Sequence, residues 1–119
     1  MKTKAEILKT LPHFTGTQKW YPWSVLTRLL LTDGTHYLAE SCGAYWLMDT
    51  IASYQARGKL TGEAFQVWTL TVTDSEALLI CTDGNDNELI RQEIPYTDFP
   101  LDKITLWCVD GVILLPSEY

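Results

Sequence analysis

The stretch LLLTDGTHYLAESCGAYWLMDTIASYQ, from Leu29 to Gln55, is the densest apolar segment of the chain. Its second half, from Ala44 to Gln55, carries apolar residues at spacings of three and four, which predicts a helix with one buried face. Ser41 is predicted to cap the start of this helix, and Arg57-Gly58 to end it. We expect the helix to cover a sheet through Ala44, Leu47, Met48, Ile51 and Ala52.

The first half of the same stretch has strand and turn signals. Residues 25–31 have strand composition, and Asp33-Gly34 predicts the turn that ends this strand, because both residues tolerate positive φ. Residues 36–40 fit either a second strand or one turn of helix, and five residues do not decide between them.

Beyond the central stretch, the pattern predicts an α+β domain. A capping box from Thr3 to Glu6 begins a short N-terminal helix, and Pro12 closes it. Short turns connect the later segments, and short connections favour antiparallel neighbours. We therefore predict an N-terminal helix and a central helix packed on a five-stranded antiparallel meander, with strands at residues 65–72, 77–82, 87–94, 104–109 and 112–115.

The length of 119 residues and the composition fit one domain over residues 1–119. Hydrophobic residues make up 46% and charged residues 20%, which is typical of a folded protein. No apolar run reaches the roughly 18 residues that cross a bilayer. Glu6 and Lys9 interrupt any signal-peptide core. We expect a cytoplasmic protein without membrane contact.

The cysteines and histidines do not form a known catalytic or metal-binding pattern. Three widely spaced cysteines, Cys42, Cys81 and Cys108, fit neither a disulfide framework nor a zinc motif, and no cofactor motif is present. Cys42 precedes a predicted helix start, which could lower its thiol pKa. A small enzyme or ligand-binding domain that uses Cys42, His36 and Asp49 is therefore an alternative to a non-enzymatic protein.

Acidic residues are concentrated in the second half of the chain. Residues 74–119 hold ten acids and two bases, a net charge of −8 within a total of −6. Solvated turns account for many acids. The alternative is an acidic surface that meets a basic protein, with candidate residues Asp83, Asp86, Glu88 and Asp98. Direct binding of nucleic acid is not expected at a pI near 4.7.

A loop at residues 13–24 carries an unusual number of aromatic rings: Phe14, Trp20, Tyr21 and Trp23. Either the loop folds against the body of the domain, or Trp20, Tyr21 and Trp23 form an exposed patch that a partner covers. Such a patch could also be the interface of a homodimer.

Two segments, LLLTDGTHYLAESCGAYWLMDTIASYQ and EIPYTDFPLDKITLWCVDGVILLPSEY, resemble a family of short bacterial, phage and plasmid proteins known only as a domain of unknown function. With FTGTQKWY and FQVWTLTV, the resemblance covers most of residues 14–119. The family assigns no catalytic residues. The resemblance implies a mobile-element setting, in which small acidic proteins often block host systems by contact.

The function predicted from these features is that of a non-enzymatic acidic binding protein, an inhibitor of a host nucleic-acid-handling or defence complex. Its expected partner is a basic or nucleic-acid-binding host protein, contacted without direct binding to nucleic acid. The enzyme or ligand-binding domain and the homodimeric interaction domain remain the alternatives.

Overall fold

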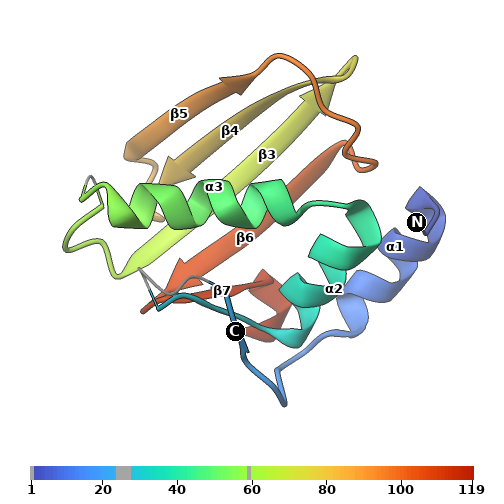
Figure 1. Cartoon of the computed structure of the whole chain (residues 1–119), viewed down its shortest axis with the longest axis horizontal. Helices are drawn as coiled ribbons and strands as arrows, with labels where there is room; N and C mark the ends of the chain where they lie inside the picture. Colours follow the sequence, from blue (N-terminus) through green and yellow to red (C-terminus); the bar gives the residue numbers. More distant parts are fainter. Residues whose placement is uncertain (1, 24–27, 59) are drawn as a thin grey trace.

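A computed structural model describes residues 2–23, 28–58 and 60–119. The described chain forms a single α+β domain with three α-helices and a seven-stranded mixed sheet (Figure 1). The helices are α1 (Lys4–Thr10), α2 (Asp33–Cys42) and α3 (Tyr45–Ala56), with short 3-10 turns η1 (Leu11–His13) and η2 (Pro116–Glu118). The strands are β1 (Tyr21–Pro22), β2 (Leu30–Leu31), β3 (Phe65–Thr73), β4 (Glu76–Thr82), β5 (Glu88–Ile94), β6 (Lys103–Val109) and β7 (Val112–Leu114).

The five predicted strands are present within a residue or two, but the predicted meander is wrong. The strand order is β1-β2-β7-β6-β3-β4-β5, so β6 pairs with β3 and not with the preceding β5. The connection after β5 carries the chain back across the sheet, and β3 thereby gains a neighbour on each side. Pairing of β2 with β7 is parallel, so the sheet is mixed and not wholly antiparallel.

The segment before α2 also differs from its prediction. The strand predicted at residues 25–31 is limited to β2 among the described residues, and residues 24–27 lie outside them. Asp33-Gly34 is not a hairpin turn, because both residues belong to the first turn of α2. Thr32 is the N-cap of this helix and exchanges hydrogen bonds with Thr35. Residues 36–40 are therefore helical.

The N-cap of α3 is Ala44, three residues after the predicted cap, Ser41. Ser41 is a buried residue of α2 and does not cap α3. The chain bends at Gly43, which adopts φ 61° as the C-cap of α2, and Ala44 then starts α3. A glycine in the left-handed region is a common way to end a helix.

A buried carboxylate holds the start of α2 against the C-terminal segment. One Glu118 oxygen accepts hydrogen bonds from Thr32 Oγ1 at 2.6 Å and from the Leu115 amide at 2.9 Å. The other oxygen accepts from the Gly34 amide at 3.0 Å. A Cβ on Gly34 would lie 2.6 Å from Glu118 Oε1, so this glycine is needed for close approach and not for positive φ.

The core lies between α3 and one face of the sheet, as the helix pattern predicted. Figure 1 shows α3 crossing the front of the sheet, with α2 on the same side. The α3 side chains Leu47, Met48 and Ile51 are fully buried and belong to one apolar cluster with Trp68 and Leu70 of β3. At the N-terminus, Thr3 caps α1 as predicted.

Candidate functional site

The opposite face of the sheet is not covered by the described helices, and we call it the open face. Alternation along β3 defines it, because Gln66, Trp68 and Leu70 are buried toward the helices while Val67 and Thr69 are only half-buried. The open face therefore presents partly exposed β-sheet side chains to solvent, although Leu114 of β7 on this face is buried.

One end of the open face is aromatic. The rings of Phe65 and Trp107 lie 5.1 Å apart, and Tyr119 packs edge-on against Trp107 at 5.3 Å. The β4–β5 turn reaches the same end, since a Cβ on Gly84 would lie 3.2 Å from the Phe65 ring. These rings partly cover one another, which leaves the other end of the face more accessible.

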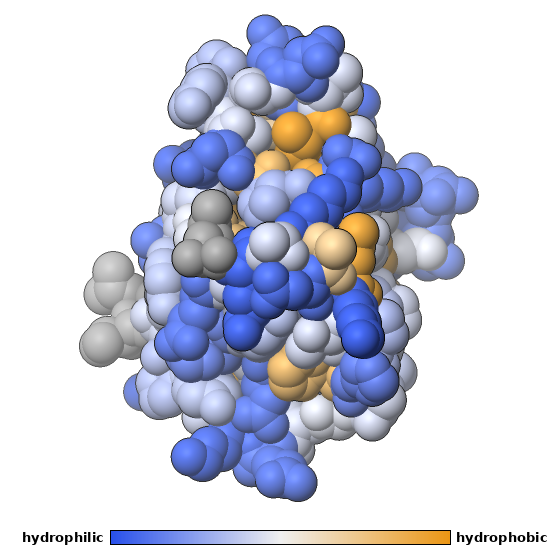
Figure 2. Space-filling model, turned by 90° about the vertical axis from the view of Figure 1, so that its right-hand side faces the viewer, coloured by the Kyte–Doolittle hydropathy of each residue, from blue (hydrophilic) through white to orange (hydrophobic). Residues whose placement is uncertain are grey.

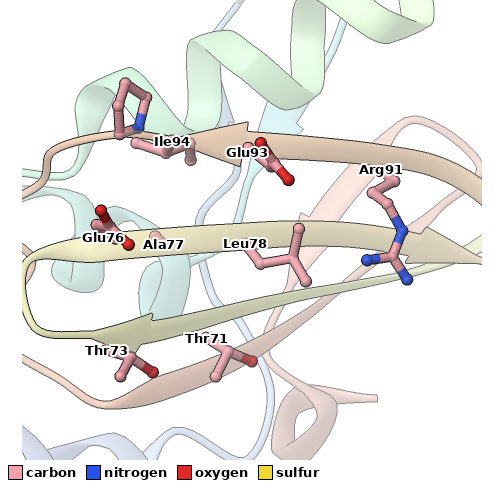
Figure 3. Close-up of a pocket in the computed structure, with 9 residues that line it drawn as sticks. Thr71, Thr73, Glu76, Ala77, Leu78, Arg91, Glu93 and Ile94 are labelled. Atoms are coloured by element: carbon pink, nitrogen blue, oxygen red, sulfur yellow. The ribbon is translucent and has the colours of Figure 1, made fainter.

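The other end of the open face contains a hollow of about 680 Å³. Figure 3 shows side chains from three neighbouring strands around it: Thr71 and Thr73 from β3, Leu78 from β4, and Glu93 from β5. We call this site the β3–β5 hollow. Its lining consists of Thr71, Thr73, Glu76, Ala77, Leu78, Arg91, Glu93, Ile94 and Pro95.

The strand register explains why these side chains meet. Leu78 is paired with Thr71 on one side and with Glu93 on the other, so all three lie in one row across the sheet. Glu76 lies two residues before Leu78 and therefore on the same face. Among the described residues, neither Glu76 nor Glu93 has a cationic group within 4.0 Å.

The cation of the hollow is already paired. Arg91 donates to Glu88 through Nη2 at 2.8 Å and through Nε at 3.1 Å. This pairing with Glu88 raises the pKa of Arg91 above its usual value, so the guanidinium stays charged. Arg91 is hydrogen-bonded to Glu88 and is also attracted by Glu93, so the carboxylates of Glu76, Glu88 and Glu93 outnumber the single cation around the hollow.

Negative charge is concentrated on this side of the molecule. Residues 74–98, which contain β4, β5 and the turns around them, hold seven acids and one arginine, a net charge of −6. The other residues hold eight acids and eight bases. The whole net charge of the protein is therefore that of one hairpin and its flanks.

The four acidic residues predicted as a site do not form one cluster. Asp83, Asp86 and Glu88 belong to the β4–β5 turn and the start of β5, whereas Asp98 follows the far end of β5, about 20 Å away at strand spacing. Asp98 lines a separate small hollow beside Trp46 of α3. The length of β5 therefore separates Asp98 from the other three acids.

Asp83 is committed to its own turn. Its carboxylate accepts from the amides of Asn85 at 2.8 Å and Asn87 at 3.3 Å, and from the Asn87 side chain at 2.8 Å. The Asn87 side chain is the main cause that lowers the pKa of Asp83, with the Asn85 amide next. Asp86 and Glu88 are both exposed, but Glu88 is paired with Arg91, so Asp86 is the more available to a partner.

The aromatic loop folds against the helices, and only part of it is exposed. Tyr21 stacks on His36 with ring centroids 4.0 Å apart and donates its hydroxyl to Asp33. Trp23 stacks on Tyr45. Trp20, in contrast, is 54% exposed. The loop ends at β1, the edge of the sheet opposite β5, so the aromatic and acidic candidates do not form one surface.

The side of the molecule that carries α1 offers no broad apolar area. Figure 2 shows this side, which is mostly hydrophilic with small, separate hydrophobic patches. Leu8 of α1 is one exposed apolar side chain, at 50%. Isolated apolar residues of this kind are ordinary on a protein surface.

Cys42, His36 and Asp49 do not share a site in the described structure. Asp49 accepts a hydrogen bond from Trp23 Nε1 at 3.0 Å, and His36 faces Glu40 at 3.4 Å. Cys42 is buried, and burial raises the pKa of its thiol to about 11. The helix that follows Cys42 does not activate it, because Cys42 is the last residue of α2.

Burial also raises the pKa of the other two thiols, Cys81 and Cys108, to about 12. Both side chains are buried in the core, where free cysteines behave as small apolar residues. Within residues 2–23, 28–58 and 60–119, no three or more His, Cys, Asp or Glu side chains are grouped so that they could hold a metal ion.

Sequence reasoning missed the hollow, although part of its signal was present. Along β5, exposed Arg91 and Glu93 alternate with the more buried Ile90 and Gln92, and this alternation is visible in the sequence. Placing Glu76 beside Glu93, however, requires the β4–β5 register, which no local pattern supplies.

The described residues contain no helix that is both long and apolar enough for a membrane span.

No curated protein and no solved structure is detectably similar to the chain. A family model does match, over residues 5–119, and its description is that of a family of unknown function, DUF6876. Because the match covers nearly the whole chain, the protein belongs to the DUF6876 family.

Proposed function

We propose that this protein is a non-enzymatic acidic binding protein that acts by contact with a basic surface of another protein. One observation carries the proposal: the entire net charge of −6 lies in residues 74–98, beside an open sheet face with a hollow. A concentrated field of one sign speeds encounter with an oppositely charged partner and fixes its orientation.

The proposed setting is a bacterial mobile element, and the proposed role is inhibition of a host nucleic-acid-handling or defence complex in the cytoplasm. The resemblance to short bacterial, phage and plasmid proteins supports the setting. Proteins that handle nucleic acid present basic surfaces, so an acidic protein can occupy such a surface and compete with the nucleic acid.

The test is capture of partners from a bacterial lysate on the immobilised protein, with elution by a salt gradient. The variant Glu76→Lys/Glu93→Lys reverses the charge of the two carboxylates that line the hollow, and Glu40→Lys on α2 is a control for charge reversal. We expect a basic protein to be retained by the wild type and by Glu40→Lys, and lost from the double variant. Equal retention on all three proteins would contradict an acidic contact surface.

A homodimer is the second candidate, and the aromatic end of the open face favours it. Val109 and Val112 lie beside Trp107 on this face and remain half-buried. Sedimentation of the wild type as a concentration-dependent dimer, abolished by Val112→Lys, would support this candidate.

The buried Cys42 thiol, with its pKa raised to about 11, weighs against the enzyme alternative, which needs a thiolate at neutral pH.

A further inference from the structure

The outer edge of β5 is a free edge of the sheet. All register partners of β5 belong to β4, and no other described group hydrogen-bonds to the main chain of residues 88–94. Figure 1 shows β5 as the outermost strand, with no element along its outer side. Alternate residues of such a strand direct N–H and C=O groups outward, which is a template for a further strand.

The two edges of the sheet differ in their ability to accept a strand. At the other edge, β1 spans two residues, and one of them is Pro22, which has no amide hydrogen. In contrast, β5 spans seven residues from Glu88 to Ile94 and contains no proline until Pro95 follows it. Only β5 is therefore long enough for several main-chain hydrogen bonds with an added strand.

The charge of this edge selects the partner. A second copy of the protein would bring another hairpin of net charge −6 against the first, and like charges facing each other across strands destabilise pairing. A strand with lysine or arginine at alternate positions would instead place its cations beside Glu93 and toward the hollow. Leu78, Thr71 and Thr73 offer a surface for the aliphatic stem of such a side chain.

We propose that an extended basic segment of a protein partner adds to β5 as a further strand, with one lysine or arginine side chain in the β3–β5 hollow between Glu76 and Glu93. This inference rests on the proposed function and specifies how the partner is recognised: main-chain hydrogen bonds supply affinity, and the alternate cations supply specificity. Charge complementarity with residues 74–98 identifies the segment as basic.

The test uses a peptide of about nine alternating lysine and valine residues, which is long enough to span β5. A second peptide has the same sequence with alternate amides N-methylated, so that it keeps the charge but cannot complete a strand ladder. Binding to the ¹⁵N-labelled protein is followed by amide shifts and by hydrogen exchange. The variants are Glu76→Lys/Glu93→Lys and the control Glu40→Lys, and the amide spectrum confirms that each is folded.

We expect the unmodified peptide to bind and to slow exchange in residues 88–94. The N-methylated peptide should bind at least about tenfold more weakly, because it loses several main-chain hydrogen bonds. The double variant should lose a similar factor, and Glu40→Lys should stay within about twofold. Equal affinity of the two peptides, shifts away from β5, or no binding to folded protein would overturn strand addition. Lysate capture that depends on Glu76 and Glu93 would still support the acidic contact surface, so the two proposals can fail separately.

Discussion

Replacing Glu118 with alanine should lower the stability of the fold more than a surface substitution does, because three hydrogen-bond donors lose their acceptor. These donors are Thr32 Oγ1 at 2.6 Å, the Leu115 amide at 2.9 Å and the Gly34 amide at 3.0 Å. A hydrogen bond to a charged group contributes about 1.5–3 kcal/mol, and the three contributions are not additive, since the freed amides can be partly hydrated. The carboxylate also lies at the N-terminus of α2, which adds up to about 1 kcal/mol.

The free energy of unfolding of Glu118→Ala should therefore fall by about 3–5 kcal/mol. For a domain of this size, that corresponds to a decrease in Tm on the order of 10–20 °C. Urea unfolding followed by tryptophan fluorescence, together with a thermal melt by circular dichroism, measures both quantities.

Two further variants make this result specific. Glu118→Gln keeps the side-chain length and one acceptor but turns an NH₂ group toward a donor, so it should fall between wild type and alanine. Glu93→Ala removes an exposed carboxylate and should change stability by no more than about 0.5 kcal/mol. A loss below about 1 kcal/mol for Glu118→Ala would refute the conclusion that Glu118 holds the start of α2 against the C-terminal segment.

Ile51→Ala, at a fully buried position of α3, should cost about 2–5 kcal/mol by urea unfolding, and a loss below about 1 kcal/mol would contradict the packing of α3 on the sheet. With its pKa raised from 9.0 to about 11, the Cys42 thiol should hold about 100-fold less thiolate at pH 8 than a thiol of pKa 9.0, so it should be alkylated only after unfolding. Rapid alkylation of the folded protein with loss of binding would instead support the enzyme alternative. Because its pKa is lowered in the fold, the Asp83 carboxylate stabilises the protein above about pH 4, and this stabilisation is lost as the pH falls through the folded pKa. Between pH 6 and 3, the free energy of unfolding should therefore fall more for wild type than for Asp83→Asn. Equal falls for the two proteins would exclude this role of Asp83. Glu88→Lys should slow association with the lysine–valine peptide at low salt more than Glu40→Lys, which lies on α2 outside residues 74–98, and equal rates would show that the field is not localised.

Local patterns predicted the elements that depend on neighbouring residues. The apolar spacing from Leu47 to Ile51 predicted the buried face of α3, and Thr3 predicted the cap of α1, because each signal involves residues within one or two helical turns.

Contacts between distant residues account for the errors. Asp33-Gly34 is a strong hairpin signal, but the Glu118 carboxylate accepts a hydrogen bond from the Gly34 amide and stabilises the start of a helix there. The strand order likewise depends on β6 pairing with β3, which no turn connects. The hollow could not be predicted, since Glu76 and Glu93 meet only through the register of two strands.

The hydrogen bond from Thr32 to Glu118 joins residues 86 positions apart, and the β2–β7 pair has a similar separation. During synthesis, β2 and the start of α2 must therefore leave the ribosome long before their partners exist. Until residues 112–118 emerge, β2 and the start of α2 lack these partners and are open to chaperones or to aggregation, although β3–β5 are already available to α3. Folding should consequently be completed after translation of the C-terminal segment, and its rate should be closer to that of β-rich proteins than of helical ones.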